Sequence, residues 1–194
     1  MGVISTVILG AARFYGRHAP LRRGKNRLIR AVSPVLRRQG KVRVASTYGN
    51  RFHLEFPQDI GWESLYVLGS YEAGTSALAA AVLEHGDIVC DVGANLGWYT
   101  MLFDRCVRPT GSVHAFEPVP WIRRKLEENC DLNEVGAGVV RNDLALGASE
   151  GAVTLYSFTG LTHGETSGRP FDGDRKSTRL NSSHSDRSRM PSSA

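Results

Sequence analysis

The sequence is poor in cysteine, has no long apolar run, and lacks acidic residues over its first 44 positions. It has three cysteines in 194 residues and no C-x-x-C pair, so neither a disulfide framework nor a metal site is expected. The apolar run at 3–12 is about ten residues long, half of what a bilayer-spanning helix needs. A secretory leader would have a charged start and a cleavage site, and neither is clear at this N-terminus. These absences favour a cytoplasmic protein in a reducing compartment.

Charge is distributed unevenly along the chain. Residues 1–44 hold eleven Arg or Lys and no Asp or Glu, whereas residues 45–174 carry more acids than bases. The net charge of +5 and the pI near 9.4 therefore come from the two ends. Because the central part has no basic patch with interleaved aromatic residues, this balance does not favour nucleic acid as a partner.

Shifts in composition divide the chain into three parts. Residues 1–40 form a basic arm, in which apolar residues at 25–38 recur at helical spacing with Pro34 among them. We favour a helix packed on the domain, and a helix bound to a membrane surface or a polyanion is the alternative. Residues 41–174 are expected to form the folded domain. Residues 175–194 are rich in serine, and we expect them to be disordered and non-native.

Within the folded domain, a hairpin and a helical stretch precede a regular alternation of strands and helices. Period-two alternation predicts the hairpin strands, at 41–45 and 51–56, and residues 59–85 are expected to be helical. The elements expected further along are strands at 87–92, 112–116, 139–142 and 153–158, and helices at 98–107 and 121–132. A β-α-β-α-β order forces parallel strands joined by crossovers. Cys90 falls inside the first of these strands and is expected to be buried.

The glycine-bearing turn after that first strand carries the chemistry. Residues 91–97 read Asp-Val-Gly-Ala-Asn-Leu-Gly and lie where doubly wound sheets bind nucleotide-like ligands. Glycine lets a ligand approach the backbone, and the following helix offers unpaired N–H groups. Glu117 stands twenty residues after Gly97, at the end of the next strand. An acid at that place accepts hydrogen bonds from both hydroxyls of a ribose, so the unit predicts a cofactor that contains adenosine.

Departures from the dinucleotide motif favour one cofactor over another. In G-x-G-x-x-G, the second glycine makes room for a pyrophosphate. Here Asn95 stands at that position and Asp91 opens the motif. S-adenosylmethionine has no phosphate, and an acid with polar groups suits its cationic sulfonium and its amino-acid moiety. The turn therefore favours a methyl donor, and an NAD-dependent oxidoreductase with a degenerate glycine loop is the alternative.

Several segments together resemble the FkbM family of methyltransferases. They are G-S-Y-E at 69–72, L-E-H-G-D-I-V at 83–89, D-V-G-A-N-L-G-W-Y-T at 91–100, H-A-F-E-P at 114–118, L-E-E-N at 126–129 and N-D-L-A-L-G at 142–147. The resemblance implies an α/β, Rossmann-like class I methyltransferase fold, a doubly wound and mostly parallel sheet with an N-terminal helical arm and β-hairpin. The family continues with a fourth strand that bears an aspartate. Nothing similar follows Phe158, so we expect the fold to be incomplete at the C-terminus.

The same resemblance implies which residues bind S-adenosylmethionine. They are Glu72, Asp91, Gly93, Ala94, Asn95, Gly97, Glu117 and Asp143. Glu117 would hold the ribose and Asp143 would lie near the adenine. Other interpretations are structural: Asp91 as a cap of the next helix, Asn95 as a turn former, and Trp98 with Tyr99 as packing residues. No residue can be named as the general base.

The function implied is O-methylation of a hydroxyl on a sugar, a glycolipid or a secondary metabolite. The expected partner is a small-molecule or glycan acceptor and not a nucleic acid. A peripheral membrane contact through the basic arm stays open. Because the strands that would complete the sheet are missing, an inactive truncated fragment is a further alternative.

Overall fold

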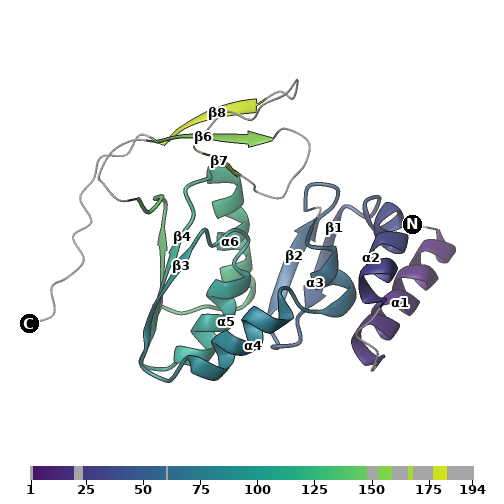
Figure 1. The fold of residues 1–194 in the computed structure, drawn as a ribbon, viewed down its shortest axis with the longest axis horizontal. Helices are drawn as coiled ribbons and strands as arrows, with labels where there is room; N and C mark the ends of the chain where they lie inside the picture. The colour runs from purple at the N-terminus through teal and green to yellow at the C-terminus, as the bar shows by residue number, and fades with distance from the viewer. Residues whose placement is uncertain are drawn as a thin grey trace, which may run out of the picture.

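The computed structural model describes residues 2–19, 24–59, 61–147, 153–158, 166–167 and 177–182 (Figure 1). The helices are α1 Val3–His18, α2 Lys25–Leu36, α3 Glu63–Leu68, α4 Ala73–Val82, α5 Trp98–Val107 and α6 Pro120–Leu132. The strands are β1 Lys41–Ala45, β2 Arg51–Glu55, β3 Ile88–Val92, β4 Ser112–Phe116, β5 Val139–Asn142, β6 Val153–Phe158, β7 Thr166–Ser167 and β8 Ser177–Ser182.

The basic arm packs on the domain through α1 and α2. Both helices contact α3 and each other, and β1 pairs with β2 as the antiparallel hairpin that the alternation predicts. Leu9 of α1 and Leu36 of α2 lie in the same buried core as Val44 and Phe52 of the hairpin. The apolar stripe of α2 is therefore used for packing, as the favoured interpretation expects. None of the described helices has the length and apolar content needed to cross a bilayer.

The expected helical stretch at 59–85 is divided into α3 and α4. Gly69 ends α3 in the left-handed region with φ 72°, and Glu72 precedes α4 with φ 42°. Glycine at the end of a helix adopts this conformation without the steric cost that a Cβ brings. The prediction of one continuous helix was wrong. Residues 69–72 separate the two helices, and the apolar periodicity of the sequence does not reveal so short a break.

The central sheet is parallel and has the order β3-β4-β5. Helices α5 and α6 lie on one side of it (Figure 1). The order and the crossovers are those of one half of a doubly wound, Rossmann-like sheet.

The prediction that Cys90 is buried was wrong. Alternate side chains of a strand point to opposite faces, and the two positions beside Cys90 in β3 are the more buried ones. Cys90 itself is exposed, and Ile88 and Val92 share that face with exposed fractions of 76% and 60%. In the part of the chain that the structure describes, this apolar face is open to solvent.

A second, antiparallel sheet has the order β7-β6-β8. Strand β6 was expected, and β8 was not, because we expected residues 175–194 to be disordered. β8 pairs with β6 along its length, with Val153 opposite Ser182. The ladder of such a pair consists of main-chain hydrogen bonds, so composition alone does not exclude a strand. The rest of the expected tail lies outside the described residues.

Candidate cofactor-binding site

The turn between β3 and α5 is a loop of five residues, 93–97, that uses left-handed backbone at three positions. Gly93 has φ 78°, Asn95 has φ 52° and Gly97 has φ 96°. Glycine and asparagine adopt this region at the lowest cost. The N–H groups of Gly93 and Ala94 both donate to the carbonyl of Phe116, at 2.9 and 3.0 Å. The loop is thereby fixed against the carboxyl end of β4.

The other three N–H groups of the loop are also satisfied internally. Asn95 donates to Oε2 of Glu117 at 3.0 Å. Leu96 donates to Oδ1 of Asn95 at 2.8 Å, and Gly97 donates to the carbonyl of Ala94 at 2.9 Å. A pyrophosphate-binding loop needs N–H groups that point at the ligand. None of the five N–H groups of this loop is therefore free to donate to a phosphate.

Two glycines of the loop serve different purposes. A Cβ at Gly97 would lie 2.7 Å from Cδ1 of Leu126, so this glycine lets α6 pack closely against the start of α5. A Cβ at Gly93 would meet no atom within 4 Å. The backbone at Gly93 therefore borders open space, which a ligand can enter.

Glu117, directly after β4, connects the loop to the next strand. Besides the bond from Asn95, its Oε1 accepts a hydrogen bond of 2.9 Å from the N–H of Val119. Its own N–H donates to the carbonyl of Asn142 at 3.0 Å. Glu117 is 5% exposed, and burial raises the pKa of its carboxyl, with hydrogen bonds from Val119 and Asn95 opposing the shift. Each carboxylate oxygen can still accept one further hydrogen bond.

Asp91 lies in β3, but its carboxylate is directed at α5. Its Oδ2 accepts a hydrogen bond of 2.5 Å from the hydroxyl of Thr100, a residue with no exposed surface. Burial raises the pKa of the Asp91 carboxyl, and the contacts with Thr100 oppose that shift. Asp91 therefore contacts the first turn of α5 through Thr100, whereas the residue at the cap position of this helix is Gly97. Thr100 was not among the predicted site residues, although its position nine residues after Asp91 in the same motif was a usable signal.

Glu72, at the start of α4, lies against α5. Its Oε2 accepts a hydrogen bond of 2.7 Å from the hydroxyl of Tyr99, and burial together with this bond raises the pKa of Tyr99 to about 12. Trp98 is buried and donates from Nε1 to the hydroxyl of Ser76 at 2.9 Å. Trp98 is thus a packing residue, as expected. Tyr99 has in addition a polar contact with Glu72 that the sequence analysis did not anticipate.

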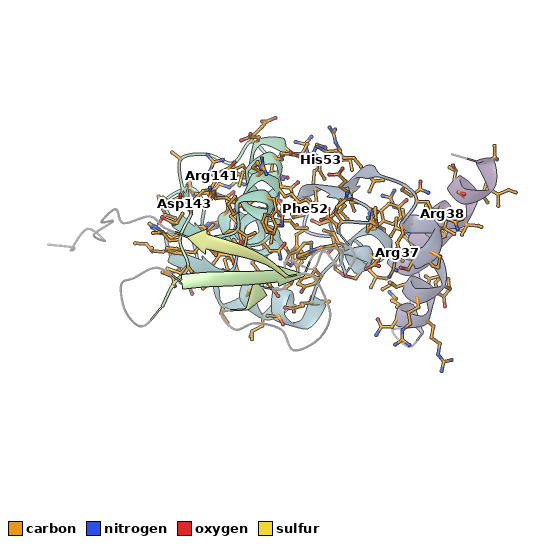
Figure 2. All side chains as sticks on the ribbon, turned by 90° about the horizontal axis from the view of Figure 1, so that it is seen from above. Arg37, Arg38, Phe52, His53, Arg141 and Asp143 are labelled. Carbon is orange, nitrogen blue, oxygen red and sulfur yellow. The ribbon has the colours of Figure 1, made fainter. Side chains whose placement is uncertain are left out.

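Asp143 follows β5 and, unlike Asp91 and Glu117, is exposed. Its Oδ2 lies 3.9 Å from Nη1 of Arg123, and its side chain is 47% exposed. Figure 2 shows it at the end of the molecule opposite Arg38 of the helical arm. Because β3, β4 and β5 are parallel, Asp91, Glu117 and Asp143 lie along the same edge of the sheet.

Asn129 of α6 holds the loop in place through its side-chain hydrogen bonds. It has no exposed surface. Its Nδ2 donates to the carbonyl of Leu96 at 2.8 Å, and its Oδ1 accepts from the N–H of His53 at 2.8 Å. One side chain therefore connects the loop, α6 and the hairpin. Asn129 belongs to one of the segments that resemble the FkbM family, but this role was not predicted for it.

Other groupings of polar residues lie away from the loop. Among the described residues, no cluster of three His, Cys, Asp or Glu side chains could hold a metal ion. A hollow of about 300 Å³ lies between β2 and α6 and shares no residue with the loop. Four of its charged side chains are paired, Lys41 with Glu128 at 2.8 Å and Lys125 with Asp59.

The chain is similar to a known methyltransferase over part of its length. Over 82 residues it is 37% identical to the 31-O-demethyl-FK506 methyltransferase FkbM of Streptomyces tacrolimicus. The match covers 42% of this chain and 31% of that protein, so the chain spans about a third of its relative. The similarity supports the resemblance to FkbM methyltransferases that the motifs indicate. No protein-family model matches the chain.

Solved structures that resemble the chain do so only partly. M. jannaschii TYW2 in complex with AdoMet has 21% identity and a TM-score of 0.42, over 54% of this chain and 43% of that chain. A SAM-dependent O-methyltransferase from Thermotoga maritima has 15% identity and a TM-score of 0.36, over 54% and 56%. A complex of aTrm5 with tRNALeu has 14% identity and a TM-score of 0.42, over 55% and 28%. Structural similarities of this limited extent support no inference about the activity or the partners of this chain.

Proposed function

We propose that this chain forms the S-adenosylmethionine-binding part of an FkbM-type methyltransferase, which methylates a hydroxyl oxygen on a sugar, a glycolipid or a secondary metabolite. The observation that carries the proposal is the loop at 93–97, whose five N–H groups are all bonded within the protein. Such a loop suits an adenosine cofactor without a phosphate, and it disfavours NAD.

The residues around the loop fit this cofactor. The open space at Gly93 leaves backbone that the methionine part can approach. Two buried carboxyl groups, of Asp91 and Glu117, make the region favourable for a cation once they are ionised. Glu117 retains acceptor capacity for ribose hydroxyls, and the exposed Asp143 stands beside the place that the adenine would take. Ala94, Asn95, Gly97 and Glu72 would shape the loop and its border with α4.

S-adenosylmethionine, when bound, supplies an electrophilic methyl group on a sulfonium. In the proposal, this chain contributes orientation. Glu117 holds the loop to β4 and Asp91 holds α5 through Thr100, so both sides of the turn are rigid before the ligand arrives. Alignment of a donor with an acceptor lowers a barrier by up to ~7–11 kcal/mol. The general base and the acceptor pocket are not assigned to residues of this chain.

Ligand binding tests the cofactor assignment. We expect S-adenosylhomocysteine to bind the chain in calorimetry and NAD not to bind. Glu117→Gln should weaken S-adenosylhomocysteine binding by about tenfold, or ~1.4 kcal/mol, because one acceptor at the ribose is lost. Glu127→Gln is the matched control, since its carboxylate pairs with Arg123 on the surface of α6. Tighter binding of NAD, or equal binding by both variants, would refute the proposal.

Methyl transfer tests the acceptor. The chain is incubated with S-adenosylmethionine labelled on its methyl group and with separate sugar, glycolipid and tRNA fractions. We expect label in a hydroxyl-bearing small molecule or glycolipid. Label in tRNA alone would show that the acceptor class is wrong, whereas binding without any transfer would mean that the chain acts as a cofactor-binding part only.

A further inference from the structure

Helix α1 is apolar on two sides, and the domain covers only one of them. Leu9, Ala12 and Gly16 face the core. The opposite side exposes the remaining large apolar residues of the helix, which are Val3 (80%), Ile4 (75%), Val7 (63%), Ile8 (41%), Phe14 (69%) and Tyr15 (48%). Counted from Val3 and again from Ile4, these positions stand at i, i+4 and i+11, which places them on one face of the helix. A helix with apolar side chains on two opposite sides usually has apolar surroundings on both of them.

The two arginines of α1 do not interrupt this outward face. The guanidinium of Arg13 lies 5.0 Å from the ring centroid of Tyr66 in α3. Arg17 donates from Nη2 to the carbonyl of Ala45 in β1, at 2.8 Å. Both side chains are therefore directed at the domain. Figure 1 shows α1 as the outermost helix of the molecule.

Exposed arginines lie on and directly after helix α2, which packs against α1. Helix α2 buries its apolar stripe and exposes Arg27 and Arg30, and Arg37 and Arg38 follow it, also exposed. Among the described residues, none of these four forms an ion pair. Residues 1–44 contain no acid that could neutralise them. Figure 2 shows Arg37 and Arg38 at the helical end of the molecule.

We propose that the outward face of α1, with the arginines of α2, docks this chain on the surface of an anionic lipid bilayer. An amphipathic helix that lies in the bilayer interface buries apolar side chains among the acyl chains, while nearby cations contact the headgroups. Aromatic residues such as Phe14 and Tyr15 suit this interface. The inference does not depend on the proposed methyltransferase function.

Charge and chemistry disfavour two other occupants. A second copy would bring together two arms that each hold nine basic residues and no acid, and like charges across an interface repel. A nucleic acid would satisfy the arginines. Its phosphate backbone, however, has no apolar surface for Val3, Ile4 and Val7.

Vesicle co-sedimentation of the full chain tests the proposal. The vesicles are phosphatidylcholine with and without phosphatidylglycerol. Ile4→Gln/Val7→Gln removes two outward side chains without changing charge. The matched control is Leu78→Gln/Val82→Gln, which removes two equally exposed apolar residues from α4. We expect binding to anionic vesicles that high salt weakens, a loss of about tenfold or more in the α1 variant, and no change in the control.

The charge contribution is tested separately. Arg27→Gln/Arg30→Gln should weaken binding to anionic vesicles, and Arg124→Gln/Arg141→Gln should not. Equal binding to both vesicle types, equal loss in the α1 and α4 variants, or no binding at all would overturn the proposal. So would sedimentation equilibrium that gives a dimer for the native chain and a monomer for Ile4→Gln/Val7→Gln, because the occupant would then be a second copy.

Discussion

The N–H of Asn95 donates a hydrogen bond of 3.0 Å to the carboxylate of Glu117, which stands 22 positions further along the chain. This bond joins the loop after β3 to the end of β4, the two places where a cofactor of a doubly wound sheet is held. The bond occupies the N–H of Asn95, so this N–H is not free to donate to a phosphate. It therefore connects the shape of the loop to the choice of ligand.

Glu117 makes the stability of the fold depend on pH. Burial raises the pKa of its carboxyl above the ordinary value of 4.5. A raised carboxyl pKa contributes stability that is fully present below the ordinary pKa and is lost as pH rises through the raised one. Urea unfolding should thus show the native chain gaining stability from Glu117 as pH falls toward 4.5, while Glu117→Gln gains none from this position. Identical pH dependence in both proteins would contradict the burial of an ionisable group here.

Thr100 supplies the hydrogen-bond donor for a buried carboxylate. Thr100→Val keeps the shape of the side chain and leaves Asp91 without that donor. We expect the free energy of unfolding to fall by about 1.5–3 kcal/mol at pH 7. Asp91→Asn/Thr100→Val should cost less than the sum of the single changes. Thr110→Val, at an exposed position, serves as the control, and additive single effects would indicate that the two residues do not interact.

The two loop glycines should respond differently to alanine. Gly97→Ala combines left-handed backbone with an overlap at Leu126, and we expect a loss of about 2 kcal/mol or more in urea unfolding. Gly93→Ala brings only the backbone cost, about 1 kcal/mol. Because its methyl group projects into the open space, it should also weaken S-adenosylhomocysteine binding. Gly74→Ala in α4, with open space and ordinary backbone, should be neutral or stabilising.

The reactivity of each cysteine depends on whether its face of the sheet or helix is covered by other residues. Burial raises the pKa of the Cys130 thiol to about 11 and raises that of Cys106, whereas Cys90 is exposed. The thiolate is the reactive form, so iodoacetamide at pH 8 should modify Cys90 first and Cys130 last. Mass spectrometry of timed digests measures the order. Protection of Cys90 in the native chain, lost on unfolding, would mean that another element covers the outer face of β3.

Strands, helices and the loop itself could be predicted from local patterns. Alternation predicted the hairpin, and short apolar runs predicted β3, β4, β5 and β6. Gly93, Asn95 and Gly97 carry their own conformational preference, so the left-handed turn follows from residue type. The spacing to Glu117 then put an acid at the neighbouring strand end, and the parallel register of β3 and β4 confirms that adjacency.

Contacts between residues that are distant in the chain could not be predicted in this way. Asp91 carries a carboxylate at the strand end, but its hydrogen bond with Thr100 depends on how α5 packs against β3. Cys90 belongs to an apolar run, yet its exposure depends on which side of the sheet the helices lie. The bridge from Asn129 to the loop and the hairpin joins segments that no periodicity relates.

For this protein, local chemistry decided where each element begins and which residues bend the loop, because backbone preference acts over a few neighbouring positions. The folded arrangement decided which side of α1 meets solvent, which carboxylate braces a helix, and which N–H groups are already bonded. Those outcomes depend on contacts between distant segments, and such contacts exist only once the helices and strands have packed.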